Sequence, residues 1–229
     1  RSLLKDKLSE LYKGVFSSNV NLINGDLRTS VISTLTKLLG KSDEISSGTT
    51  SNTLELLSLT FNTEGENSIH TVEALPEEVG QQAVSAISNL IEASGFDEKN
   101  QTEKITKTIT GIGKLSLVDK PAGTKIEFGS SQINLVQARE YVSEIVGKPI
   151  QNDDSEITVP NGVFDNLDPV KRDLLGFVDV RLLKWNKNPH SHIEIPSNIT
   201  SAVISADLLD DSGKELKIEN LETPIQIKI

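Results

Sequence analysis

Residues 197–229 read SNITSAVISADLLDDSGKELKIENLETPIQIKI. Apolar residues alternate with polar ones over 202–208, at 216–218 and again over 225–229, and the turn sequence 211–213 separates the first two segments. Alternation with a period of two, interrupted by turns, predicts half-buried antiparallel strands. Because the alternation does not fade before the last residue, we expect the strands to be completed by residues that follow this sequence.

The remainder of the chain divides into a helical part and a β-rich part. Before residue 113 the apolar residues recur at helical spacing, and after it β-branched residues, alternation and turn sequences prevail. A run of helices followed by a run of strands is typical of the α+β class. The sequence therefore predicts a helical subdomain over 1–113 and an antiparallel β-sandwich subdomain over 114–229.

Turn and capping residues set the expected element bounds. Asp26 is expected to cap the second helix and Ser51 or Asn52 the third, Pro76 opens the fourth, and Gly111 to Gly113 end the fifth. The expected helices cover 3–11, 27–39, 52–61, 76–91 and 105–112. The expected strands cover 115–118, 125–128, 132–137, 156–159, 177–185, 202–209, 215–218 and 225–229, and residues 141–147 fit either a helix or a strand.

Composition excludes several classes of partner. The chain has 229 residues and a formal net charge of −10 without a dense basic run, which argues against nucleic acid as a partner. It contains no apolar stretch long enough to cross a bilayer, so no direct membrane insertion is expected.

Cysteine is absent, which rules out disulfides and thiolate metal sites within these residues. Two sequons, at Asn100 and Asn198, make these asparagines candidates for glycosylation and favour secretion.

Signatures of catalysis are missing. The chain has no G-x-S-x-G, no H-E-x-x-H and no cysteine nucleophile, so we expect no catalytic residue and no enzymatic activity. The tetrapeptide at 111–114, Gly-Ile-Gly-Lys, resembles the end of a phosphate loop. It follows a helix instead of preceding one, and Leu115 replaces the required Ser or Thr. We interpret it as the end of a helix and expect no cofactor.

The histidines and three acidic clusters are candidate metal ligands. His190 and His192 would share one face of a strand, but no third ligand is near them in the sequence, and the only other histidine is His70. Three acidic clusters supply oxygen ligands of the kind calcium prefers, although none matches an EF-hand loop. These clusters are Asp153-Asp154-Glu156, Asp165-Asp168 and Asp207-Asp210-Asp211. We interpret the acidic clusters as polar turns and the histidine pair as part of a solvated loop between Pro189 and Pro196, and we predict no metal site.

Six residues are expected to matter for structure instead of chemistry. Trp185, the only tryptophan, is expected to anchor the core of the sandwich and to form a corner with Pro189. Four apolar strand residues are expected to fill that core: Ile204, Leu208, Ile225 and Ile227. On this interpretation Ile227→Asp would abolish folding, because it would bury an unpaired charge.

The β-rich part resembles the late strands of a GAIN domain, most closely the subtype of polycystin and receptor-for-egg-jelly proteins. In that family an aromatic residue and Asn-Pro lead through a polar loop into S-x-V-I-S-x-x-L. A glycine turn and L-x-V-x-N-L-x-x-P-I-x-I-x-I follow. The matching positions here are Trp185, Asn188, Pro189, Ser201, Val203, Ile204, Ser205, Leu208, Gly213, Leu216, Ile218, Asn220, Leu221, Pro224, Ile225, Ile227 and Ile229.

This resemblance implies a helical subdomain and a twisted β-sandwich on the extracellular face of the plasma or ciliary membrane. In the family, a His-Leu before Thr or Ser near the last strand is a self-cleavage site, and the cleaved strand stays in the sandwich. That motif is absent from this chain. The resemblance therefore implies a non-catalytic scaffold that supports a cleavage segment located beyond these residues.

The partners implied by the resemblance are the remaining C-terminal strand or strands of the parent chain. A polycystin-type channel subunit and an extracellular filament protein are further candidates. Two other functions fit the sequence. One is a stand-alone cell-surface adhesion or coat module built from a helix bundle and a sandwich. The other is a hydrolase of surface carbohydrate, which the scarcity of aromatic residues disfavours.

Overall fold

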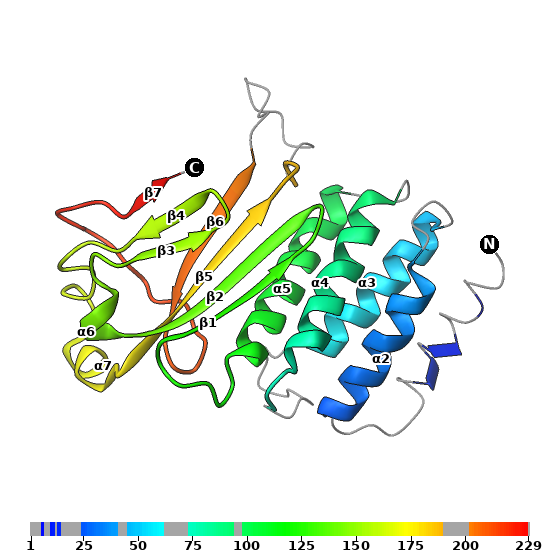
Figure 1. Ribbon diagram of the computed structural model, residues 1–229, viewed down its shortest axis with the longest axis horizontal. Coiled ribbons are helices and arrows are strands. Elements are labelled where there is room, and N and C mark those ends of the chain that lie inside the picture. The colour runs from blue at the N-terminus through cyan, green and yellow to red at the C-terminus, as the bar shows by residue number, and fades with distance from the viewer. Residues whose placement is uncertain are drawn as a thin grey trace.

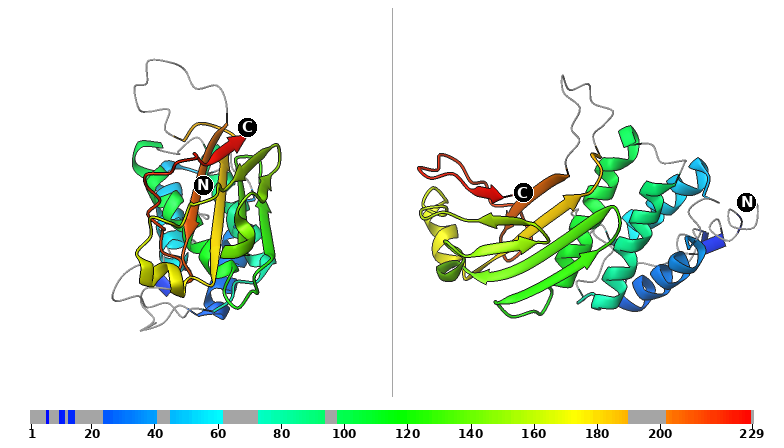
Figure 2. Two further views of the ribbon diagram at one scale, coloured as in Figure 1. Left: turned by 90° about the vertical axis from the view of Figure 1, so that its left-hand side faces the viewer. Right: turned by 45° about the horizontal axis from the view of Figure 1, so that its top comes forward.

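The structure, a computed structural model, describes residues 6, 10–11, 13–14, 24–40, 45–61, 73–93, 98–189 and 202–228, and of residues 98 and 100 only the backbone. Helices, a four-stranded antiparallel sheet and a three-stranded antiparallel sheet form three successive layers (Figure 1). The helices cover one face of the four-stranded sheet, and the three-stranded sheet lies over its other face (Figure 2). This order confirms the α+β class.

In the described part of the chain, four long helices make up the helical layer. They are α2 (Gly25–Leu38), α3 (Ser47–Phe61), α4 (Glu77–Glu92) and α5 (Glu98–Ser116). Their buried apolar residues form one cluster together with residues of the four-stranded sheet. The helix expected over 3–11 falls mostly outside the described residues.

Capping corrects two of the expected helix starts. The Asn24 side chain, instead of Asp26, caps α2 by accepting the Leu27 N–H at 2.9 Å. Helix α3 starts at Ser47, ahead of both Ser51 and Asn52, and the Thr50 N–H bonds to the Ser46 carbonyl at 2.9 Å. Helix α4 follows Pro76 with Glu77 and Glu78 in its first turn, as expected.

Helix α5 runs straight through both glycines that were expected to end it, and it includes part of the expected strand 115–118. A Cβ atom on Gly111 would lie 1.9 Å from the Phe61 carbonyl oxygen. On Gly113 it would lie 1.9 Å from the Gln137 Nε2 atom. The two glycines therefore serve close packing of α5 against α3 and the sheet, and not termination of the helix.

The central sheet has the order β1-β2-β5-β6, with all neighbours antiparallel. Its strands are β1 (Thr124–Gly129), β2 (Ile133–Tyr141), β5 (Phe177–Trp185) and β6 (Val203–Leu209). On β5, Leu183 and Trp185 contribute to the helix-side cluster, while Val180 and Leu182 contribute to the cluster shared with the second sheet. Covered on both faces and paired at both edges, β5 is buried along nearly its whole length.

The second sheet has the order β3-β4-β7 and is smaller. Its strands are β3 (Pro149–Asn152), β4 (Ser155–Thr158) and β7 (Gln226–Lys228), and the short helices α6 (Val142–Ile145) and α7 (Pro169–Leu174) lie in its connections. Residues 215–218, expected to form a strand, contribute only an isolated bridge between Glu215 and Leu209. The expected strand 225–229 is reduced to β7, and Ile229 lies outside the described residues. Among the helices that the structure describes, none has the length and apolarity needed to cross a membrane.

Candidate strand-binding groove

A groove opens between the free edges of the two sheets, and we call it the β6–β7 groove. Its volume is about 250 Å³. Its lining is mostly apolar and comes from β4, β6, β7 and the segment that joins β6 to β7: Ile157, Ala206, Asp207, Leu208, Glu215, Leu216, Ile218, Ile225 and Ile227. Ile157 and Leu208 are buried at its base, whereas Ile227 is 48% exposed.

Both strands that flank the groove are edge strands. β6 pairs with β5 on one side. Among the described residues, its other edge is occupied only near Leu208 and Leu209, where the Leu216 N–H bonds to the Leu208 carbonyl at 2.8 Å. Of the strands that the structure describes, β7 pairs with β4 alone, with Ile227 opposite Ile157. Within the described residues, no strand pairs with the outer edge of β7 or with that of β6 over 203–207. Unpaired strand edges are places where another strand can add.

The segment between β6 and β7 explains the alternation that suggested an additional strand. Leu216, Ile218, Leu221 and Ile225 turn toward the core between the sheets and stay partly exposed. The Asn166 amide holds this segment by donating to the carbonyls of Glu219 and Asn220 at 2.9 and 3.2 Å. The alternation in this segment thus reflects apolar side chains that pack inward, although the backbone does not form the hydrogen-bond ladder of a strand.

An ion pair borders the groove. The Arg181 Nε and Nη2 atoms contact the Asp207 Oδ2 atom at 2.9 and 2.8 Å, and Nη2 lies 3.8 Å from Glu215 Oε1. Arg181 itself is 5% exposed. Because Asp207 is on β6 and Glu215 follows it, this arginine fixes the polar wall of the groove against the buried strand β5.

A second ion pair lies next to the first along β5. Arg139 of β2 donates to both carboxylate oxygens of Asp179 at 2.7 and 2.8 Å, and its guanidinium stacks 4.3 Å from the Phe177 ring centroid. Burial raises the pKa of Asp179, Arg139 opposes that rise, and the charges of Asp211 and Asp210 add to it. Sequence reasoning missed these pairs, although charged residues inside the apolar run 177–185 were a signal for them.

The expected structural residues fall in different places. Trp185 is buried, but it packs between the helices and the central sheet instead of in the sandwich core. Leu208 is buried between the two sheets as expected, while Ile204 and Ile225 are half-buried. The expectation that Ile227 fills the core was wrong, because edge strand β7 leaves this side chain open to the groove.

The two sequons and the corner residue can be located in part. Pro189 is buried, and its carbonyl accepts the hydroxyl of Thr102, the third residue of the first sequon, at 2.9 Å. Asn100 lies in the first turn of α5. Asn198 lies outside the described residues, as do His70, His190 and His192.

The acidic clusters are engaged by protein donors. Asp154 pairs with Lys184, Asp168 caps α7 by accepting the N–H groups of Val170 and Lys171, and Asp207 pairs with Arg181. The Asp210 carboxylate accepts the Ser212 and Lys214 N–H groups at 3.0 and 2.9 Å. In the described part of the chain, no group of three or more acidic or histidine side chains could hold a metal ion.

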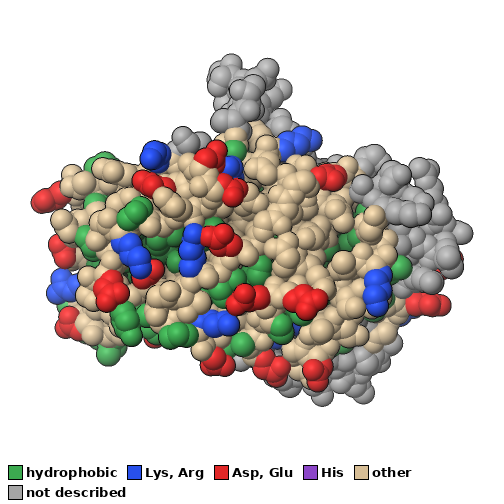
Figure 3. Space-filling model, in the orientation of Figure 1, with side chains coloured by type: hydrophobic (Ala, Val, Ile, Leu, Met, Phe, Trp, Pro, Cys, Tyr) green, Lys and Arg blue, Asp and Glu red, His purple; other side chains and the backbone are tan. Residues whose placement is uncertain are grey.

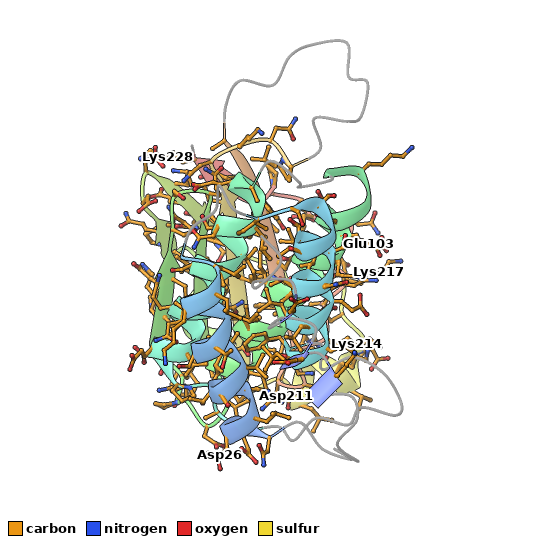
Figure 4. The ribbon with its side chains drawn as sticks, turned by 90° about the vertical axis from the view of Figure 1, so that its right-hand side faces the viewer. Asp26, Glu103, Asp211, Lys214, Lys217 and Lys228 are labelled. Atoms are coloured by element: carbon orange, nitrogen blue, oxygen red, sulfur yellow. The ribbon has the colours of Figure 1, made fainter. Side chains whose placement is uncertain are left out.

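Surface charges are mixed in sign. Acidic and basic side chains are interspersed over the face drawn in Figure 3. Figure 4 labels Glu103 and Lys217, each of which belongs to an exposed local pair. The hydrogen bond from Lys107 lowers the pKa of Glu103, and the one to Glu219 raises the pKa of Lys217. Such exposed pairs contribute little to stability.

Comparison with known proteins supports the fold. No family model and no curated protein sequence matches the chain. Among solved structures, the chain is similar to the full extracellular region of zebrafish Gpr126/Adgrg6, with a TM-score of 0.62 and 13% sequence identity. The similarity covers 90% of this chain and 28% of that one. The same arrangement of helices and sheets thus occurs within the extracellular region of a larger protein.

Proposed function

We propose that this chain is a GAIN-like extracellular scaffold without catalytic activity of its own, and that its β6–β7 groove holds an extended apolar strand. The observation that carries the proposal is the groove itself. Its base is formed by Ile157 and Leu208, and Ile227 is exposed at its rim. An added strand would bury these apolar groups and pair with free backbone groups of β6 or β7.

The occupant we favour is the segment that follows Ile229 in the parent chain. The sequence pattern of 197–229 resembles that of GAIN domains, in which a strand near a self-cleavage site is retained in the sandwich. This chain shares its fold with part of the extracellular region of another protein, which supports placing the chain outside the cell. The polycystin-like subtype, a polycystin-type channel subunit or filament protein as a partner, and cleavage of the following segment rest on the sequence resemblance alone.

Hydrogen exchange can test this function. The chain would be produced twice, once as residues 1–229 and once extended by the residues that follow Ile229 in its parent. We expect the extension to slow amide exchange in β7 and over 203–207 of β6, and to raise the melting temperature. Equal exchange and equal melting temperatures in the two forms would overturn the proposal.

Two variants sharpen the experiment. Ile227→Asp places a charge at the rim of the groove, so it should cancel the protection given by the extension while the unextended chain still folds. Val170→Asp is the matched control, because Val170 is 65% exposed on α7 and does not line the groove. If both variants lose protection equally, the groove is not the binding site.

A further inference from the structure

The sequence contains two Asn-Gly pairs, Asn24-Gly25 and Asn161-Gly162, and the structure treats them differently. An Asn-Gly pair can deamidate without an enzyme, because glycine has no side chain to keep its backbone nitrogen away from the asparagine amide. Whether it does so in a folded protein depends on how freely these two groups can approach each other. We infer that Asn161 is a site of spontaneous deamidation and that Asn24 is protected.

Hydrogen bonds hold both groups that would have to react at Asn24, namely its side-chain amide and the Gly25 nitrogen. Its Oδ1 atom accepts the Leu27 N–H at 2.9 Å as the cap of α2. The nitrogen that would attack, Gly25 N, donates to the Glu73 carboxylate at 2.8 Å. Reaction at Asn24 therefore requires the first turn of α2 to open.

Asn161 has none of these restraints. It is exposed in the turn over 161–166, and Gly162 adopts a φ of +75°. The turn is closed by the Asp165 N–H, which bonds to the Gly162 carbonyl at 3.1 Å and leaves the Gly162 nitrogen out of that bond. Within the described residues, neither the Asn161 amide nor the Gly162 N–H has a hydrogen-bond partner.

The reaction needs only water. The Gly162 nitrogen gives its proton to solvent and attacks the Asn161 Cγ atom, so that a C–N bond forms. The bond from Cγ to the side-chain nitrogen breaks, and ammonia leaves after taking up a proton. Water then opens the cyclic imide at either carbonyl and yields aspartate or isoaspartate. Each product adds one negative charge to a turn that already contains Asp165, and isoaspartate also adds a methylene group to the backbone.

The location gives the modification a structural consequence. Asn161 lines a second pocket, of about 370 Å³, together with Thr223 and Pro224, which precede β7, and with Gln226, the first residue of β7. The new charge, and in isoaspartate also the longer backbone, would therefore lie in the pocket beside the start of edge strand β7.

Peptide mapping by mass spectrometry tests the inference. The folded protein would be incubated at neutral pH in water enriched in ¹⁸O, and the fragments containing Asn24, Asn152 and Asn161 would be followed over time. Asn152 is the buried control, because its amide donates to the carbonyls of Asn134 and Leu182 at 3.2 and 3.3 Å. We expect Asn161 to take up ¹⁸O at least about tenfold faster than Asn24, since protection follows the free energy of local opening.

Denaturant separates the effect of structure from that of sequence. In urea both Asn-Gly pairs should react at similar rates, because the contacts of Asn24 are lost. Asn161→Gln should remove the rapid reaction while the rate at Asn24 stays unchanged. If Asn161 in the folded protein reacts no faster than Asn24, the inference is wrong.

Discussion

Gly113 of α5 lies so close to Gln137 of β2 that a Cβ atom on the glycine would come within 1.9 Å of the Gln137 Nε2 atom. Gln137 is 1% exposed and sits in the middle of the central sheet, so it has little room to retreat. The contact between the helical layer and the sheet therefore depends on the absence of a side chain at residue 113.

We expect Gly113→Ala to destabilise the protein by about 1–3 kcal/mol, because overpacking outweighs the gain in helix propensity. Gly48 is the matched control, since it is also helical and a Cβ atom there would meet nothing within 4 Å. Gly48→Ala should be neutral or stabilise by up to about 1 kcal/mol. Urea denaturation measures both values. A stabilising Gly113→Ala would show that α5 packs less closely than described.

Leu208 and Ile227 both line the β6–β7 groove but differ in burial, at 6% and 48% exposed. We expect Leu208→Ala to cost about 2–4 kcal/mol, because it leaves a cavity between the sheets. Ile227→Ala should cost less than about 1 kcal/mol, since half of its side chain already contacts water. Equal losses in the two variants, measured by thermal and urea unfolding, would contradict the open groove.

Local patterns in the sequence predicted most elements, because helical spacing and alternation follow directly from which face is buried. Strand 177–185 is found as expected, where neighbours on both edges stabilise it. Residues 215–218 show the limit of this reasoning, because their apolar residues pack inward without a partner strand. Alternation indicates a buried face, and a strand forms only where a hydrogen-bonding partner is also present.

Other errors come from contacts between residues far apart in the sequence. Gly111 and Gly113 suggested the end of a helix because their contacts with Phe61 and Gln137 cannot be read from neighbouring residues. Arg139 and Asp179 are 40 residues apart, so no local pattern joins them. The groove was not predicted as a site for the same reason: its walls come from β4, β6 and β7.

Thr102 offers a test that separates glycosylation from structure. Its hydroxyl is buried and donates to the Pro189 carbonyl, so Thr102→Ala should cost about 1–2 kcal/mol relative to wild type when both proteins are produced without glycosylation. Thr102→Ser keeps both the sequon and a hydroxyl, whereas Asn100→Gln removes only the sequon. The masses of these variants after secretion from glycosylating cells would show whether Asn100 is modified. Unchanged stability of Thr102→Ala would contradict the structural role of the hydroxyl.

The buried pair Arg139–Asp179 can be examined with a double-mutant cycle. Arg139→Met or Asp179→Leu alone should cost about 3–5 kcal/mol, because each leaves a buried charge without its partner. The double variant should be more stable than the sum of the two losses predicts, with a coupling of at least about 2 kcal/mol. Additive losses would indicate that the two charges act independently in the folded protein.

Arg139→Met should also change the dependence of stability on pH. Burial raises the pKa of Asp179 and Arg139 opposes this rise, so without Arg139 the folded-state pKa moves further up. In this variant Asp179 binds a proton more tightly in the folded protein than in the unfolded chain. The free-energy cost of burying the charged Asp179 carboxylate is therefore at its full value when the pH is above the folded-state pKa. This cost disappears as the pH falls toward the unfolded-state pKa of about 3.9. We therefore expect the difference in unfolding free energy between wild type and Arg139→Met to narrow from pH 7 to about pH 4.5, as urea denaturation at each pH would show. A difference that widens on acidification would mean that Asp179 is not the group that Arg139 stabilises.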